Sequence, residues 1–238
     1  MNLLDRLLQI EARRRAWEVT APRTHHPNQP TPETMHRLLA LRSLELVVAE
    51  WTELAVTGMP DLGPGVREIL ISHQKDEGKH DEQLDLLALY WGAESRPEAY
   101  DLVTRWESDP SDPLVKKLVL EAMVFFQVLA VLPEIAPDDA FTQAVRQWIL
   151  FDESAHVASA RLLVKHQQKK IPPALVQLAL DTVAWMLGDL DPGQVTRYQS
   201  IAQQVIKTGR SDLVNGNSLV SHQDFFTQRD NRSIIYAS

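Results

Sequence analysis

The sequence predicts an all-α fold, and two observations support this prediction. Glycine and proline divide the 238 residues into segments of helical length, and no segment alternates apolar and polar residues for long enough to form a core strand. Hydrophobic residues make up 44% of the chain, which is enough for a substantial core. We therefore expect one helical domain over residues 1–208, followed by an irregular C-terminal tail over residues 209–238.

Helix start and stop signals define the first elements. A short amphipathic helix is predicted over residues 3–19, followed by a proline-bearing linker in which Thr31 can cap the next helix and Pro32 can take its first position. Four long helices are expected to form the core of the domain. They are predicted over residues 33–57, 64–91, 113–133 and 138–168, the last with Asp138 as its cap.

A long connection joins the second and third of these helices. Gly92 is a C-terminal signal for the second helix, and Asp112 is an N-terminal cap for the third. The residues between them can hold one short helix and can cross the length of a bundle. Two further helices are predicted over residues 172–187 and 192–208.

Composition excludes several classes of function. The chain has no cysteine, so any metal ion must be bound by histidine and carboxylate side chains. A formal net charge of -8 argues against nucleic acid or an anionic membrane as the main partner. The N-terminus lacks the uninterrupted apolar core of a secretory signal, and the most apolar window, residues 114–132, includes two lysines, Glu121 and Gln127. We therefore expect a cytoplasmic protein without a membrane span.

One motif, Asp-Glu-x-x-His, occurs twice, at residues 76–80 and 152–156. Residues three apart lie side by side on a helix, so each motif directs a carboxylate and an imidazole toward one point. These side chains are Glu77 with His80, and Glu153 with His156. The first pair lies on the apolar face of its predicted helix, which indicates that it faces the interior. Such a pair of side chains suits a metal ion.

The other two long helices each contain an acid where an apolar residue is expected. Glu50 shares a face with Val47 and Trp51, and Glu121 has Leu118 and Phe125 one turn to either side. Both glutamates are therefore predicted to be buried. Together with Glu77 and Glu153 they would make four buried carboxylates, at a cost of several kcal/mol per ion. Two divalent cations would neutralise this charge.

The order of these six positions resembles the ferritin-like di-iron carboxylate superfamily, which includes bacterioferritin and the small subunit of ribonucleotide reductase. One Glu from each of two helices and one Glu-x-x-His from each of the other two is the ligand pattern of its bundles. The resemblance covers roughly residues 33–168. It implies a four-helix bundle with a long crossover and a pair of iron ions, of manganese ions, or of one of each. It also implies that Asp76 and Asp152 each accept a hydrogen bond from the ligand histidine of the opposite motif.

Other residues have two interpretations each. His73, one turn before Glu77, is either an additional ligand or, as we prefer, a residue just outside the ligand sphere. The aromatic residues Trp51, Phe125 and Trp148 are either core residues or candidates for a substrate pocket beside the metal ions. The basic run at residues 13–15 is either a solvated helix face, as we prefer, or an anion-binding site.

Three functions are compatible with the resemblance. The leading one is an oxidoreductase, an oxygenase or oxidase that activates dioxygen and acts on a small organic substrate. We expect it to receive electrons from a donor and to form a homodimer. The second is a radical protein like the ribonucleotide reductase small subunit. Leu84 argues against it, because that family typically has its radical tyrosine at this position. The third is a ferroxidase or metal-binding protein.

Overall fold

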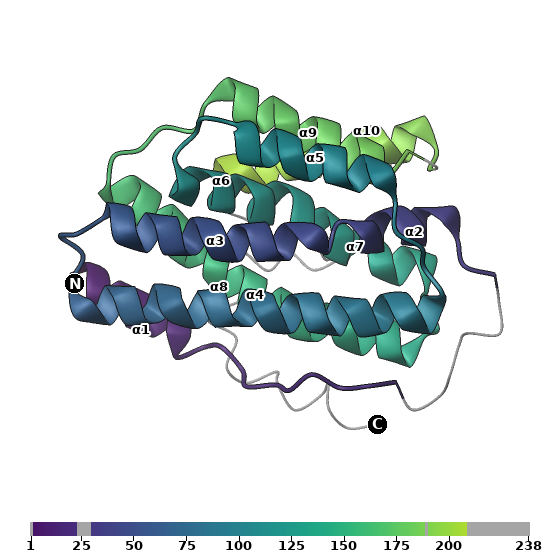
Figure 1. The fold of residues 1–238 in the computed structure, drawn as a ribbon, viewed down its shortest axis with the longest axis horizontal. Helices are drawn as coiled ribbons and strands as arrows, with labels where there is room; N and C mark the ends of the chain where they lie inside the picture. The colour runs from purple at the N-terminus through teal and green to yellow at the C-terminus, as the bar shows by residue number, and fades with distance from the viewer. Residues whose placement is uncertain (1, 23–29, 189, 209–238) are drawn as a thin grey trace.

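The structure is a computed structural model that describes residues 2–22, 30–188 and 190–208. Within these ranges the regular elements are all helical and no strand occurs, so the predicted all-α class is confirmed. The helices lie roughly along one common direction (Figure 1). The predicted tail, residues 209–238, lies outside the described residues.

The elements have the following bounds. They are α1 (Leu3–Glu11), α2 (Glu33–Ala40), α3 (Ser43–Gly58), α4 (Pro64–Trp91), α5 (Pro97–Ser108), α6 (Pro113–Leu120), the π-helix η1 (Glu121–Phe125), α7 (Phe126–Ile135), α8 (Ala140–His166), α9 (Pro173–Met186) and α10 (Pro192–Thr208). Because α6, η1 and α7 follow one another without a break, they form a single long helix with a π-helical turn in its middle.

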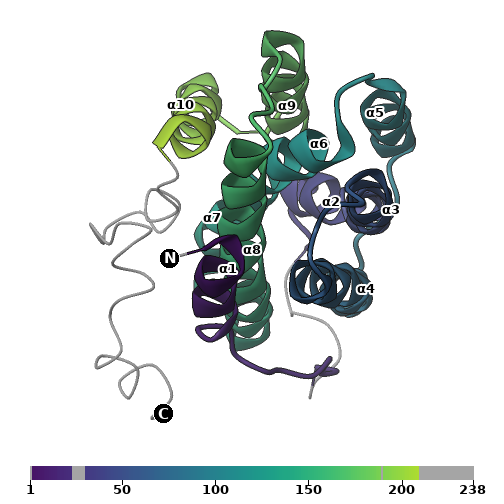
Figure 2. The same ribbon diagram turned by 90° about the vertical axis from the view of Figure 1, so that its left-hand side faces the viewer.

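Four long helices form the centre of the molecule. Helix α3 packs against α4, α4 against α8, α8 against the α6–η1–α7 helix, and the latter against α3, which closes a ring. Helix α5 crosses between the end of α4 and the start of α6, so that these two long helices run in the same direction (Figure 1). Helices α9 and α10 pack on the α6–η1–α7 side, and α1 packs on α4 and α8 (Figure 2).

The α6–η1–α7 helix is the most buried element. Its side chains are buried without interruption from Leu114 to Leu132, because α3, α8, α9 and α10 all pack against parts of it. By length and composition, Pro113–Ile135 is the one stretch among the described helices that could cross a membrane, but 83% of its most apolar window is buried inside the protein. This burial is what a core helix of a bundle requires.

Two of the predicted helix-end residues, Asp112 and Gly92, lie at the ends of their helices as expected, and a third is displaced by one residue. The Asp112 side chain accepts a hydrogen bond from the backbone N–H of Leu114 at 3.0 Å. Gly92 ends α4 with φ of 64°, a left-handed conformation that glycine adopts without steric cost. The cap of α8 is Asp139 rather than the predicted Asp138, and its carboxylate accepts the N–H of Thr142 at 2.7 Å.

Two predicted helices have different bounds. The N-terminal helix ends at Glu11 instead of residue 19, and residues 15–22 run without regular structure along the bundle. The helix predicted over residues 33–57 is divided by a tight turn at Leu41 and Arg42, whose N–H groups bond three residues back. The hydroxyl of Thr31 donates to the carbonyl of Trp91 instead of capping α2.

Candidate metal centre

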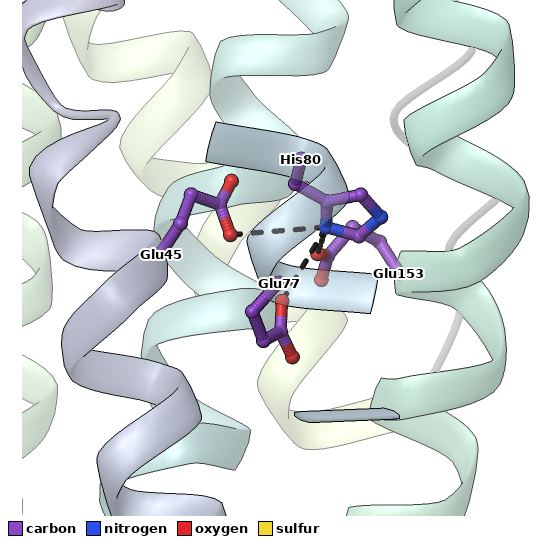
Figure 3. A group of neighbouring side chains, drawn as sticks. All are labelled: Glu45, Glu77, His80 and Glu153. Carbon is purple, nitrogen blue, oxygen red and sulfur yellow. Dashed lines mark ion pairs between the residues drawn. The ribbon is translucent and has the colours of Figure 1, made fainter. Parts of the chain in front are cut away.

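The two Glu-x-x-His motifs face each other at the middle of the bundle. Glu77 and His80 project inward from α4, and Glu153 and His156 project inward from α8, and all four side chains are fully buried. Figure 3 shows three of them together with Glu45 of α3. The helical spacing of three residues therefore brings both motifs to a common interior point, as the sequence indicates.

Glu121 enters the same region from the third long helix. It is fully buried and begins the π-helical turn η1. A π-helical turn inserts an extra residue into an α-helix and is frequently found at functional sites. This turn was not predicted, because nothing in the local sequence distinguishes it from an α-helix.

The fourth carboxylate is Glu45 and not Glu50. Glu50 is exposed, so the prediction that it is buried and belongs to the cluster is wrong, whereas Glu45 is only 2% exposed. The buried face of α3 runs through Leu44, Val48 and Thr52, and Glu45 lies on this face. Five residues further on, at 100° per residue, Glu50 has turned about 140° away from it.

The nitrogen and oxygen atoms of the cluster approach one another closely. His80 Nδ1 lies 3.1 Å from a carboxylate oxygen of Glu153, 3.3 Å from one of Glu77 and 3.8 Å from one of Glu45. Figure 3 draws these three contacts of His80 as dashed lines. His156 Nδ1 lies 3.2 Å from the other oxygen of Glu77.

These atoms form two overlapping groups that could each hold an ion. In each group, one ligand atom per residue lies within 4.8 Å of all the others. The first group, here called position 1, consists of Glu45, Glu77, His80 and Glu153. The second group, here called position 2, consists of Glu77, Glu121, Glu153 and His156. Glu77 and Glu153 belong to both and could bridge two ions.

The cluster fits a metal because most of its ligand atoms lack a hydrogen-bond partner. Among the described residues, no hydrogen bond reaches one oxygen each of Glu45, Glu77 and Glu121, both oxygens of Glu153, or Nδ1 of His80 and His156. A buried polar atom without a hydrogen bond costs about 1–3 kcal/mol, and more when it is charged. Oxygen and imidazole nitrogen atoms in this arrangement would be satisfied by cations such as iron or manganese.

Burial and mutual repulsion alter the proton affinity of the cluster. Burial raises the pKa of Glu45 and of Glu121 to about 8. Burial alone would lower the pKa of His156, but the charge of Glu77 and the hydrogen bonds to Asp76 and Glu77 together raise this pKa to about 10. Without a metal, protons therefore take the place of cations on these ligands.

Asp76 and Asp152 lie behind the histidines. His156 Nε2 is 3.3 Å from an oxygen of Asp76, and His80 Nε2 is 3.4 Å from an oxygen of Asp152. Each acid thus faces the histidine of the opposite motif. This leaves Nδ1 of each ring directed at the carboxylates, the orientation that a ligand to a metal requires.

The N-terminal segment, residues 12–22, covers these two acids. Arg14 forms ion pairs with Asp76 and, at 3.3 Å, with Asp152, while Trp17 donates its indole N–H to Asp152 at 2.7 Å and stacks on His80. Burial alone would raise the pKa of Asp76, but the hydrogen bond to His156 and the charge of Arg14 hold it below its ordinary range. The basic run at residues 13–15 is therefore not simply a solvated face.

His73 is fully buried but belongs to neither group. Its Nε2 lies 2.7 Å from a carboxylate oxygen of Glu11, and its ring lies 4.3 Å from the ring of His156. Burial and the charge of His156 lower the pKa of His73 to about 4. His73 thus packs against one ligand histidine from outside the cluster.

Lys117 belongs to the surroundings of the cluster, although the sequence analysis assigns it no role there. Its side chain is fully buried, and its ammonium group lies 2.7 Å from an oxygen of Glu77 and also contacts Glu121. Burial alone would lower the pKa of Lys117, but the charges of Glu121 and Glu77 raise it above its ordinary value. One signal for this residue is present in the sequence, because Lys117 lies one helical turn before Glu121.

Of the predicted pocket residues, Phe125 lies beside the cluster. It lines a narrow apolar pocket of about 20 Å³ that reaches Glu45. The other lining residues are Leu38, Leu41, Arg42, Leu84, Val128, Leu129 and Ile149. Trp51 instead packs against Trp106, and Trp148 stacks on Trp17.

A larger pocket of about 370 Å³ lies on the surface between α3, α4 and α5. Arg42, which pairs with Asp85 at 2.9 Å, lines both this pocket and the apolar one. Arg42 therefore lies where the surface pocket and the narrow pocket beside the cluster approach each other.

Comparison with known proteins gives no match: no family model, no curated protein and no solved structure matches the chain.

Replacing Arg14 with alanine is expected to destabilise the metal-free protein by about 3 kcal/mol, because Asp76 and Asp152 would lose one of the two basic side chains that pair with them and keep only Lys79, at 3.2 and 3.9 Å. Chemical denaturation measures this change. Arg6→Ala is the matched control, since Arg6 is an exposed residue of α1 with the same charge. Equal stability of the two variants would contradict the structural role of Arg14.

Proposed function

We propose that this protein is a dinuclear metal carboxylate enzyme, of the ferritin-like type, that activates dioxygen and oxidises a small organic substrate. One observation carries the proposal: four carboxylates and two imidazoles from four helices converge in a buried cluster, and most of their ligand atoms have no hydrogen bond among the described residues. Ligation by nitrogen and oxygen alone favours iron or manganese. A reduced pair of such ions would supply electrons to dioxygen, and an external donor would restore them.

The surroundings of the cluster support an oxidation of this kind. The burial of all six ligands excludes bulk water, which protects a reactive site from side reactions. Asp76 and Asp152 would orient the two histidines, and Arg14 and Trp17 would hold the acids in place. These groups would keep the ligand geometry constant while the charge at the metals changes.

The narrow pocket beside the cluster supports a path for dioxygen to the ligands. The narrow pocket that reaches Glu45 is lined mainly by aliphatic side chains and Phe125, which suits dioxygen or an apolar group. Leu84, where a radical tyrosine would be expected, is one of these apolar lining residues.

Metal analysis and dioxygen uptake test the proposal. Protein produced with iron and manganese both available, or reconstituted anaerobically with ferrous iron, is expected to contain about two ions per chain. The reduced protein should then consume dioxygen faster when a small-molecule extract is present, and labelled dioxygen or two-electron oxidation should appear in one compound of that extract. Two bound ions with an uptake rate that no small molecule changes would favour a ferroxidase instead.

A further inference from the structure

Two adjacent lysines of α6 have opposite environments. Lys117 directs its ammonium group into the carboxylate cluster. Lys116 directs its ammonium group away from it, to the backbone carbonyls of Trp106, Glu107 and Asp109 at 3.2–3.3 Å, where it satisfies the C-terminal end of α5. Lys116 therefore has an evident structural role, whereas Lys117 places a positive charge where a metal ion is expected.

The contacts of Lys117 distinguish the two ion positions. Lys117 contacts one oxygen each of Glu77 and Glu121, and these same two oxygens face His156 Nδ1 at 3.2 and 3.7 Å. The other oxygen of Glu77 faces His80 Nδ1 at 3.3 Å. The ammonium group thus shares the ligand atoms of position 2, while the ligand atoms that face His80 in position 1 remain available.

An ammonium group and a metal ion cannot use these oxygens together. A first-row divalent ion binds a carboxylate oxygen at about 2.0–2.2 Å, as zinc does. An ion bound to the same oxygens of Glu77 and Glu121 would therefore be pressed against the Lys117 ammonium, with strong repulsion between the two cations at low local dielectric. The second ion can bind only after the Lys117 side chain has left its place.

We propose that Lys117 serves as a built-in counter-ion at position 2 and thereby makes the two metal positions unequal. The first ion binds at position 1, and the second binds at least about 100-fold more weakly because it must displace the ammonium group. This inference deepens the proposed function and rests on the metal site proposed there. Its consequence is that a chain short of metal holds a single ion, which cannot supply electrons as a pair does.

Equilibrium binding of Mn²⁺ to the metal-free full-length chain tests the inference. Electron paramagnetic resonance of the free ion after dialysis gives both dissociation constants without any measure of activity. For the wild-type chain, the second constant is expected to exceed the first by about 100-fold or more. In Lys117→Met, which removes the charge and retains a side chain of similar length, the two constants are expected to lie within about 10-fold of each other.

Two further variants complete the comparison. Lys116→Met should retain the wild-type ratio of the two constants, because Lys116 does not contact the cluster. Lys117→Arg should also retain a large ratio, because the charge remains. If Lys117→Met does not fold, Lys117→Gln replaces it, since its amide can still hydrogen-bond to the two glutamates.

The titrations distinguish failure of the role of Lys117 from failure of the metal site. Two equal constants in the wild-type chain, or an unchanged ratio in the folded uncharged variant, would overturn the role of Lys117 and leave the metal site intact. Absence of Mn²⁺ binding in a wild-type chain whose circular dichroism shows it to be folded would overturn the metal site itself, and with it the inference. A stepwise wild-type titration that becomes a single step in Lys117→Met would support both.

Discussion

Replacing Glu153 with alanine is expected to remove both metal ions from the protein. Glu153 is one of the two carboxylates that belong to both ion positions, and its oxygens lie 3.1 Å from Nδ1 of His80 and 3.9 Å from Nδ1 of His156. Loss of one shared ligand would weaken both positions and leave Glu77 as the one residue common to them. Metal content is expected to fall from about two ions per chain to a small fraction of one, which elemental analysis of the purified variant measures.

Glu50→Ala is the control for this experiment. Glu50 is exposed on α3, so its removal is expected to leave the metal content unchanged, whereas Glu45→Ala should deplete position 1 alone. The metal-free Glu153→Ala protein is expected to be less stable than the metal-free wild type, because Nδ1 of His80 loses the carboxylate that lies 3.1 Å away, so circular dichroism is used to select conditions in which the variant is folded. Metal loss in a folded variant therefore cannot be attributed to unfolding. Full metal retention by Glu153→Ala would contradict the ligand assignment.

The part of the site that the sequence predicts correctly lies within single helices. A spacing of three residues necessarily puts Glu77 beside His80, and Glu153 beside His156, on any α-helix. Burial of these four side chains then requires only that the apolar face of each helix turns inward, which the neighbouring aliphatic residues indicate. Asp76 and Asp152 directly precede Glu77 and Glu153 in the sequence, and each lies behind the histidine of the opposite motif.

The part that the sequence does not predict depends on how segments meet. The buried face of α3 is set by its packing and by the tight turn that precedes it, and its exposed Leu46 and Leu54 resemble core residues, so the sequence pattern favours Glu50 over Glu45. The N-terminal helix ends early because residues such as Trp17 and Thr20 make hydrogen bonds to distant helices instead. Such long-range partners have no signature in local periodicity.

Metal-free protein is expected to lose stability as the pH rises above neutrality. The pKa values of Glu45 and Glu121 in the folded chain, about 8, exceed the ordinary value of 4.5, and that of His156, about 10, exceeds 6.5. A pKa raised by folding gives stability that is complete below the ordinary value and is lost as the pH rises through the folded value. The two glutamates lose their contribution between about pH 4.5 and 8, and His156 loses its own between about pH 6.5 and 10.

Bound metal should reverse this dependence, because the ions replace the protons. Near pH 7, Glu45, Glu121 and His156 all hold protons that metal binding must release, so the affinity for metal increases with pH. Each proton released contributes about tenfold per pH unit to the overall binding constant. The difference in Tm between Mn²⁺-loaded and metal-free protein should therefore widen steadily from pH 6 to pH 8.5. A difference that stays constant or narrows over this range would mean that protons and metal ions do not compete for these residues.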